Sequence, residues 1–335
     1  MTGRGATAFA ALLLLLAAAV RAEPVTLRFA STLPLAEGGT QAIADWMKKT
    51  ADASGGTLQW QQFWDGQLIG NPTKEYDAMI NGVSDAAIIV TPFVQSLFPD
   101  FSIFSAPFVV GDAEEAAVAG WRLYERGMIR GLDKVHVAAI YSNDIAGIHL
   151  AKAITTLDEV KGLKIRVSGP AEGKIVEAFG GVPVGMNIMQ AAEALSVGTY
   201  QGTLNGWGGN HAYRFTPLLK SHIEAPLGVR IFFLGISKPA YDKLALEGRH
   251  AIDENSGYAL SVALGKLSDE TGAAERDESV KRGQTIIKPT GEQEKTFEAT
   301  FRPLVDKWIA DTPDGAAKFQ ALRQIIADYR KGEHQ

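Results

Sequence analysis

The sequence predicts an α/β protein of two lobes, each an open, mostly parallel sheet flanked by helices, with a ligand cleft between the lobes. Short apolar strand patterns alternate with amphipathic helix patterns along most of the chain, which is typical of open parallel sheets. The length of 335 residues also exceeds one typical domain. No Ser/Pro-rich linker divides the chain, so we expect it to cross between the lobes more than once and to form a hinge.

The first third shows two strand–helix units and a further strand. Apolar and polar residues alternate in each partly exposed strand, apolar positions repeat at helical spacing in each helix, and the last strand is apolar throughout. The expected elements are a strand starting at Val25, a helix through 43–51 that stops at Gly55-Gly56, a strand at 58–63, a helix from Pro72 to Gly82, and a strand at 86–90.

The middle of the chain repeats this pattern, and the end is helical. A Gly-Pro pair opens one of the central helices, and a Thr-Pro pair separates the two C-terminal stripes. The expected elements are a strand at 163–167, a helix from Gly169-Pro170 to Gly180-Gly181, a strand at 182–186, a helix at 189–197, a strand at 202–205, and helical stripes at 297–308 and 319–329.

The N-terminus and the composition predict an exported protein. Residues 1–22 contain a basic start, an apolar run and small residues before Glu23, the pattern of a cleaved secretory signal peptide. We therefore expect a periplasmic protein that does not span the membrane after cleavage. The chain has no cysteine, which excludes disulfides and thiolate chemistry. A net charge of −5 without a basic cluster makes nucleic acid an unfavourable partner.

Motifs for catalysis are missing from the sequence. There is no nucleophile elbow, no metalloprotease helix motif, no phosphate-binding loop and no dinucleotide fingerprint. The six histidines are scattered, and the closest pair, His211 and His222, is eleven residues apart. We therefore expect that the protein is not an enzyme and that it binds neither a metal nor a cofactor.

One residue favours ligand binding. Arg166 stands at the end of a predicted strand and directly precedes a helix start. Ligands of open α/β sheets bind beyond the carboxyl ends of the strands. A guanidinium there can hold a carboxylate through two parallel hydrogen bonds. The same pattern also fits an arginine on a solvated strand face, and the residues alone leave both interpretations open.

The segment from Asp158 to Asn187, DEVKGLKIRVSGPAEGKIVEAFGGVPVGMN, resembles the solute-binding proteins of TRAP (tripartite ATP-independent periplasmic) transporters of the DctP type. Further matching motifs occur in the family's order: LRFASTLP, GQLIG at 66–70, NGVSDAAIIV from 81, FPDFSIFSAPF from 98, and EAPLGV from 224. This resemblance implies two discontinuous lobes joined by a long helix. It also implies capture of a small organic anion for delivery to the membrane permease subunits.

The resemblance also implies site residues. The family's carboxylate-binding arginine corresponds to Arg166, and its ligand-facing Asn to Asn205. Ile188 and Trp207 stand at positions that line the cleft in other members. Further residues expected to surround the ligand's body or its polar groups are Trp64, Phe93, Gln67, Thr91, His149 and Asn187.

Departures from the family pattern narrow the expected ligand. Gly208 replaces a Glu that helps to hold a metal in some members, which disfavours a metal-assisted site. The register from Asn143 to Gly147 lacks the second arginine of sialic-acid-binding members. We therefore expect one carboxylate on an apolar or aromatic body.

The predicted function is that of a periplasmic receptor for an organic acid. Two alternatives stay open from the residues: a ligand-binding protein that feeds a sensor or chemoreceptor, and a secreted enzyme of unknown reaction. The predicted organisation is a signal peptide at 1–22, a first lobe from 23–143 plus 231–271, and a second lobe from 144–230 plus 272–335.

Overall fold

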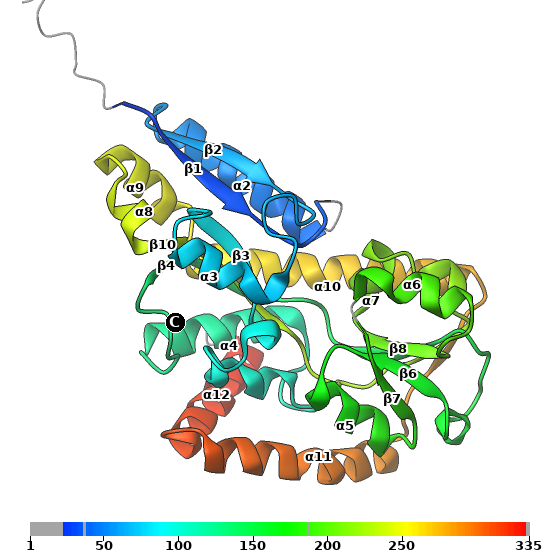
Figure 1. Ribbon diagram of the computed structural model, residues 1–335. Coiled ribbons are helices and arrows are strands. Elements are labelled where there is room, and N and C mark those ends of the chain that lie inside the picture. Colours follow the sequence, from blue (N-terminus) through cyan, green and yellow to red (C-terminus); the bar gives the residue numbers. More distant parts are fainter. Residues whose placement is uncertain (1–22, 36–37, 187, 333–335) are drawn as a thin grey trace, which may run out of the picture.

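The computed structural model describes residues 23–35, 38–186 and 188–332. The predicted signal peptide at 1–22 and Asn187 lie outside the described residues. In the described part of the chain, the strands form two separate sheets with helices packed on their faces (Figure 1). The predicted two-lobed α/β architecture is confirmed. No helix among these residues is both long enough and apolar enough to cross a membrane.

The first sheet has the strand order β2-β1-β3-β10-β4 in the described residues. Its strands are β1 (Val25–Ala30), β2 (Leu58–Phe63), β3 (Ala86–Val90), β4 (Val135–Ser142) and β10 (Ile231–Ser237). Every residue of β3 and β10 is buried, because helices cover both faces of this sheet. They are α2 (Gly38–Ala53), α3 (Glu75–Ile80), α4 (Ala113–Glu125), α8 (Lys238–Asp242) and α9 (Leu246–Glu254).

The second sheet has the order β11-β9-β5-β8-β6-β7. Its strands are β5 (Gly147–Leu150), β6 (Lys164–Val167), β7 (Val182–Gly185), β8 (Gly202–Asn205), β9 (Ser221–Ile223) and β11 (Thr285–Ile287). The helices of this unit are α5 (Pro170–Ala178), α6 (Ile188–Ser196) and α7 (Trp207–Ala212). The sequence predicted five of these nine elements to within a few residues, namely β6, β7, β8, α5 and α6, and did not predict β5, β9, β11 or α7.

The sheets are more mixed than the predicted mostly parallel arrangement. Five of the nine neighbouring strand pairs of the described residues are parallel. The antiparallel pairs all involve β10 or β5. Each of these strands follows a crossing between the two units, and the chain therefore enters the new sheet against the direction of its neighbours.

The units are connected by two crossing segments and by long helices. The segments β4–β5 and β9–β10 run side by side, where Asn143 and Arg230 hydrogen-bond to each other. The 24-residue helix α10 (Tyr258–Lys281) contacts α4 in the first unit and α7 in the second (Figure 1). This is the long connecting helix that the family resemblance implies.

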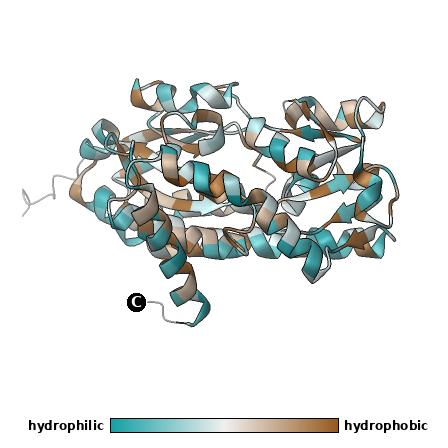
Figure 2. Cartoon of the chain, turned by 90° about the horizontal axis from the view of Figure 1, so that it is seen from below, coloured by the Kyte–Doolittle hydropathy of each residue, from teal (hydrophilic) through white to brown (hydrophobic). Residues whose placement is uncertain are grey.

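The C-terminal helices differ from the predicted division, which placed residues 272–335 in the second lobe. Helix α11 (Gly291–Asp311) leaves the second unit, and α12 (Gly315–Arg330) packs against α4 of the first (Figure 1). Leu322, Ile325 and Ile326 share one hydrophobic cluster with the first sheet, because their stripe is apolar and α4 offers an apolar face. Figure 2 shows hydrophilic and hydrophobic residues side by side along the outer helices, as amphipathic packing requires.

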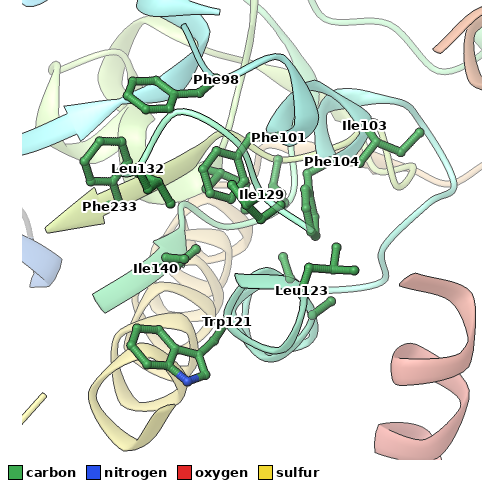
Figure 3. Packing of buried hydrophobic residues seen from close by; sticks show 14 of the residues in the cluster. Phe98, Phe101, Ile103, Phe104, Trp121, Leu123, Ile129, Leu132, Ile140 and Phe233 are labelled. Carbon is green, nitrogen blue, oxygen red and sulfur yellow. The ribbon is translucent and has the colours of Figure 1, made fainter. Parts of the chain in front are cut away.

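The largest hydrophobic cluster holds the first unit rigid. Phe98, Phe101, Phe104 and Phe233 lie in its centre and are almost fully buried (Figure 3). Phe98 contacts Phe233 edge to face, with 5.0 Å between ring centroids. Phe101 and Phe104 anchor the helical turns of 99–105 to this cluster.

Candidate ligand-binding site

A cavity of about 50 Å³ lies between the two sheets, at the carboxyl ends of strands β3, β6 and β8. The first unit lines it with apolar side chains, and the second unit lines it mainly with polar groups. The lining residues are Leu33, Val90, Phe93 and Phe232 from the first unit, Arg166, Ser168, Ile188, Asn205, Gly209 and Tyr213 from the second, and Asn143 and Arg230 from the crossing segments.

Arg166 is the most unusual group in this cavity. It is the largest fully buried side chain of the described residues, with 1% of its surface exposed. Its Nε donates to the carbonyl oxygen of Met186 at 2.9 Å, and its Nη1 has no hydrogen-bond partner among the described residues. Burial, reinforced by the charge of Arg230, lowers the pKa of Arg166 to about 10, so the group stays cationic at neutral pH. A buried cation without a counter-charge is unfavourable unless an anion joins it.

The local chain explains why Arg166 reaches the cavity. It is the third residue of β6, and Gly169-Pro170 starts α5 three positions later. Lys164 shares its face of the strand but remains exposed at the far end. The alternation that the sequence predicted for this strand therefore holds, and the helix turn at Pro170 leaves the end of β6 open to the cleft.

Asn205 lies beside Arg166 at the end of the neighbouring strand β8. Its side-chain amide donates to Oδ1 of Asn210 at 3.3 Å, and its Oδ1 accepts from Nη2 of Arg230 at 2.9 Å. A Cβ atom on Gly209 would lie 2.7 Å from the Asn205 amide nitrogen. Glycine at this position therefore permits the first turn of α7 to pack directly on Asn205.

A second glycine of the same segment, Gly206, allows the start of α7 to pack against Asp144 in the β4–β5 crossing segment. A Cβ atom on Gly206 would lie 2.3 Å from Oδ1 of Asp144. The Asp144 carboxylate accepts hydrogen bonds from the backbone N–H groups of Trp207 and Gly208 at the start of α7. The Gly206–Asn210 stretch thus serves close backbone packing around Asp144 and Asn205.

Arg230 is a site residue that sequence reasoning missed. Its Nε lies 3.2 Å from Oε1 of Glu172, and the Oε2 atom of Glu172 accepts from the backbone N–H of Ser168 at 2.6 Å. The register from 143 to 147, where sialic-acid-binding members have their second arginine, has none in this sequence. The structure brings Arg230 in from another segment. The available signal was an arginine directly before an unbroken apolar strand, IFFLGIS.

The structure brings four of the predicted residues to this cavity and places four others elsewhere. Arg166, Asn205, Ile188 and Phe93 line it together. Thr91 lines a larger adjoining cavity, while its hydroxyl donates to the carbonyl oxygen of Ile231 at 2.9 Å. The residues that line neither cavity are Trp64, Gln67, His149 and Trp207. Asn187 lies outside the described residues.

The four residues placed elsewhere have local packing roles. Trp64 is buried against Phe29, with 4.7 Å between ring centroids, and Gln67 is exposed. His149 and Trp207 belong to a buried cluster behind the cavity. Direct ligand contact by these residues stays a prediction that this arrangement does not favour.

The buried cluster supports Asn205 from behind. His149 Nε2 lies 3.0 Å from the Asn205 carbonyl oxygen, and its Nδ1 lies 2.8 Å from Nδ1 of His222. The Trp207 ring covers both imidazoles, with centroid distances of 4.7 Å and 4.3 Å. Burial lowers the pKa of His149 well below its ordinary value and that of His222 to about 4.

A larger cavity of about 510 Å³ adjoins the first one. Phe93, Ser168 and Arg230 line both, so these three residues form the wall that the cavities share. Its remaining lining comes from the helical turns of 91–106, the start of α5 and the end of α11. The larger cavity therefore lies directly against the inner one.

Comparison with known proteins places the chain in a family. The model of "Bacterial extracellular solute-binding protein, family 7" (DctP) matches residues 29–311. No functionally curated protein sequence matches the chain.

Several solved structures are similar over almost their whole length. A TRAP solute-binding protein from Rhodoferax ferrireducens T118, in complex with copurified benzoate, is 28% identical with a TM-score of 0.83, covering 92% of this chain and 99% of that one. A marine metagenome TRAP solute-binding protein specific for aromatic acid ligands, in complex with 3-hydroxybenzoate, is 26% identical with a TM-score of 0.85 and the same coverage.

A more distant structure shares the fold. This TRAP protein from Bordetella bronchiseptica, with bound (R)- and (S)-mandelate, is 20% identical with a TM-score of 0.78, covering 91% of this chain and 100% of that one. The family model, the two-lobed fold and the buried arginine at the end of β6 agree with the resemblance drawn from the sequence. The chain belongs to family 7 of the bacterial extracellular solute-binding proteins.

Proposed function

We propose that this protein captures a small organic acid by its carboxylate in the inner cavity and delivers it unaltered to the membrane permease subunits of a TRAP transporter. It acts in the periplasm, after export by the signal segment at 1–22. The observation that carries this proposal is the Arg166 guanidinium, which is buried, cationic and only partly hydrogen-bonded. A carboxylate supplies both the missing charge and the missing acceptor.

The opposite wall supports an apolar body for this acid. Leu33, Val90, Phe93 and Phe232 present hydrocarbon and aromatic surface across the cavity from Arg166. Benzoate and 3-hydroxybenzoate occupy the two similar structures of 28% and 26% identity. An aromatic monocarboxylate combines the two features that the walls of this cavity recognise.

Thermal denaturation and calorimetric titration with a series of organic acids test the proposal. A bound acid at 100 times its Kd should stabilise the fold by about 2.7 kcal/mol. The matched control is a neutral isostere of each acid, for example benzamide beside benzoate, which keeps the ring but lacks the charge. Binding that does not distinguish the two would contradict carboxylate capture.

Delivery without chemistry has its own measurement. The acid recovered after long incubation should have an unchanged mass, because the described residues that line the cavity include no His, Asp, Glu or Lys to activate a hydroxyl group as a nucleophile. A product of different mass would identify the protein as an enzyme.

A further inference from the structure

Three charged groups meet where the two cavities adjoin: Arg166 and Arg230 line the inner cavity, and Glu172 lines the larger one beside it. Arg230 and Glu172 form an ion pair at 3.2 Å, and their side chains are only 18% and 14% exposed. Both charges act on Arg166: the charge of Arg230 lowers the pKa of Arg166, and the charge of Glu172 raises it. At such low exposure the charges are screened far less than on the surface.

Two of the three side-chain nitrogen atoms of Arg230 have hydrogen-bond partners within the protein. Its Nε faces Glu172, and its Nη2 donates to Oδ1 of Asn205. Among the described residues, in contrast, the side chain of Arg166 has one hydrogen-bond partner, the neutral carbonyl oxygen of Met186. One positive charge of the cavity is therefore balanced within the protein, and one is not.

Other charged groups nearby do not change this balance. Arg130 and Lys307 line the adjoining cavity, but Arg130 is paired with Asp100 at 2.8 Å and Lys307 with Asp311 at 2.6 Å. Lys174 lines it as well and is exposed to solvent. The unbalanced charge inside the cleft is that of Arg166.

We infer that Glu172 is a specificity-determining residue that limits the ligand to a single negative charge. It neutralises Arg230 and repels a second carboxylate that would approach the same wall. The backbone N–H of Ser168 holds the Glu172 carboxylate in place at 2.6 Å, so it cannot move away from a competing anion without losing this bond. Selectivity of this kind depends on a repulsive element as much as on an attractive one. This inference rests on the proposed function and names its substrate class as monocarboxylates.

An isosteric pair of acids tests the charge limit. 3-Nitrobenzoate and isophthalate have the same shape, but the first carries one negative charge and the second two. In calorimetric titrations at neutral pH we expect the wild type to bind 3-nitrobenzoate at least 100-fold more tightly. Butyrate and succinate provide the same comparison for aliphatic acids.

Glu172→Gln should narrow this ratio at least tenfold, because Arg230 then offers an uncompensated charge to the second carboxylate. The matched control is Glu177→Gln, which removes the same charge from an exposed position on the same helix and should leave the ratio unchanged. Melting curves of both unliganded variants report whether they are folded.

A double-variant cycle separates charge selection from a structural role. Arg230→Gln leaves Glu172 negative and unpaired, so the affinity for 3-nitrobenzoate should fall at least tenfold. Adding Glu172→Gln to this variant should restore most of the loss. A purely structural pair would give a double variant that binds no better than the single one.

The outcomes distinguish two failures. Equal binding of 3-nitrobenzoate and isophthalate by the wild type, or a ratio in Glu172→Gln equal to that in Glu177→Gln, overturns the charge limit alone. If none of the four acids binds the wild type, the proposal of carboxylate capture is wrong and the charge limit falls with it.

Discussion

The two walls of the inner cavity have opposite chemistry. The wall from the first sheet consists of apolar side chains, including Phe93 and Phe232, and the wall from the second sheet presents Arg166 and Asn205. Each wall is backed by a separate hydrophobic cluster of its own unit. Charge recognition and shape recognition therefore reside on different units, and a ligand must touch both to be held. We therefore expect ligand binding to be coupled to closure of the lobes.

Removing the charge should have the largest effect. Arg166→Met keeps the length of the side chain but loses the guanidinium, and we expect the affinity for a carboxylate to fall at least 100-fold, since two charge-assisted hydrogen bonds of about 1.5–3 kcal/mol each are lost. Arg166→Lys keeps the charge without the planar fork and should also lose about 100-fold. Calorimetric titration measures both.

The unliganded stability of these variants sharpens the test. Replacing a buried, poorly paired cation with an apolar side chain is often neutral or stabilising, so the melting temperature of Arg166→Met should not fall. Lys164→Met, on the exposed end of the same strand, is the control for removing a positive charge. An affinity loss below tenfold for Arg166→Met would show that Arg166 does not hold the ligand.

The apolar wall should contribute less. Phe93 is half-buried and lines both cavities, and truncating it removes aromatic contact of about 1.5–3 kcal/mol when fully formed. We expect Phe93→Ala to weaken binding of an aromatic acid by roughly tenfold and that of butyrate much less. Leu97→Ala, at an exposed position a few residues away, serves as the control. An equal loss for both kinds of acid would contradict a shape-recognising role for this wall.

The two units also differ in their buried titratable groups. In the first unit, burial raises the pKa of Glu75 to about 8 although Thr32 donates two hydrogen bonds to it. In the second unit, burial lowers the pKa of His222 to about 4. The stability linked to Glu75 is complete below its ordinary pKa of 4.5 and is lost as the pH rises through 8. The stability linked to His222 is complete above its ordinary pKa of 6.5 and is lost as the pH falls toward 4.

A predicted effect on stability rather than on affinity follows from this difference. Between pH 6.5 and 4, His222 should cost the wild type on the order of 3 kcal/mol of unfolding free energy, or roughly 5–10 °C in melting temperature. His222→Gln should flatten this acid slope, whereas His250→Gln, at an exposed position, should not. Melting curves at half-unit pH steps measure the slope. An identical slope in wild type and His222→Gln would show that His222 does not titrate in this range.

Most of the fold could be predicted because its signals are local. Strands β2, β3 and β8 have the predicted bounds, since alternation, apolar runs and terminal glycines act within a few residues. The direction of β10 and β5 could not be predicted, because it depends on crossings between distant segments. The sequence did not predict that α12 packs against the first unit, because its apolar stripe fits more than one surface.

The site was predictable only where one strand carries the signal. Arg166 follows from its position at the end of a strand and from the family motif. Arg230 and Glu172 are 58 positions apart, and only the folded chain shows that they pair. His149 lies in the same row of the sheet as Arg166, through Thr203, but Trp207 covers it, and single-strand patterns do not reveal which part of a sheet face a helix covers.

The position of α12 has a consequence for how the molecule assembles. The cluster that holds the first sheet needs Leu322, Ile325 and Ile326, which are among the last residues of the chain. The core of the first unit is therefore incomplete until these residues have packed into it. Until α12 has packed against α4, the apolar face of α4 is exposed and can contact chaperones or other chains. Shortening the chain at its end should thus destabilise the unit at its beginning.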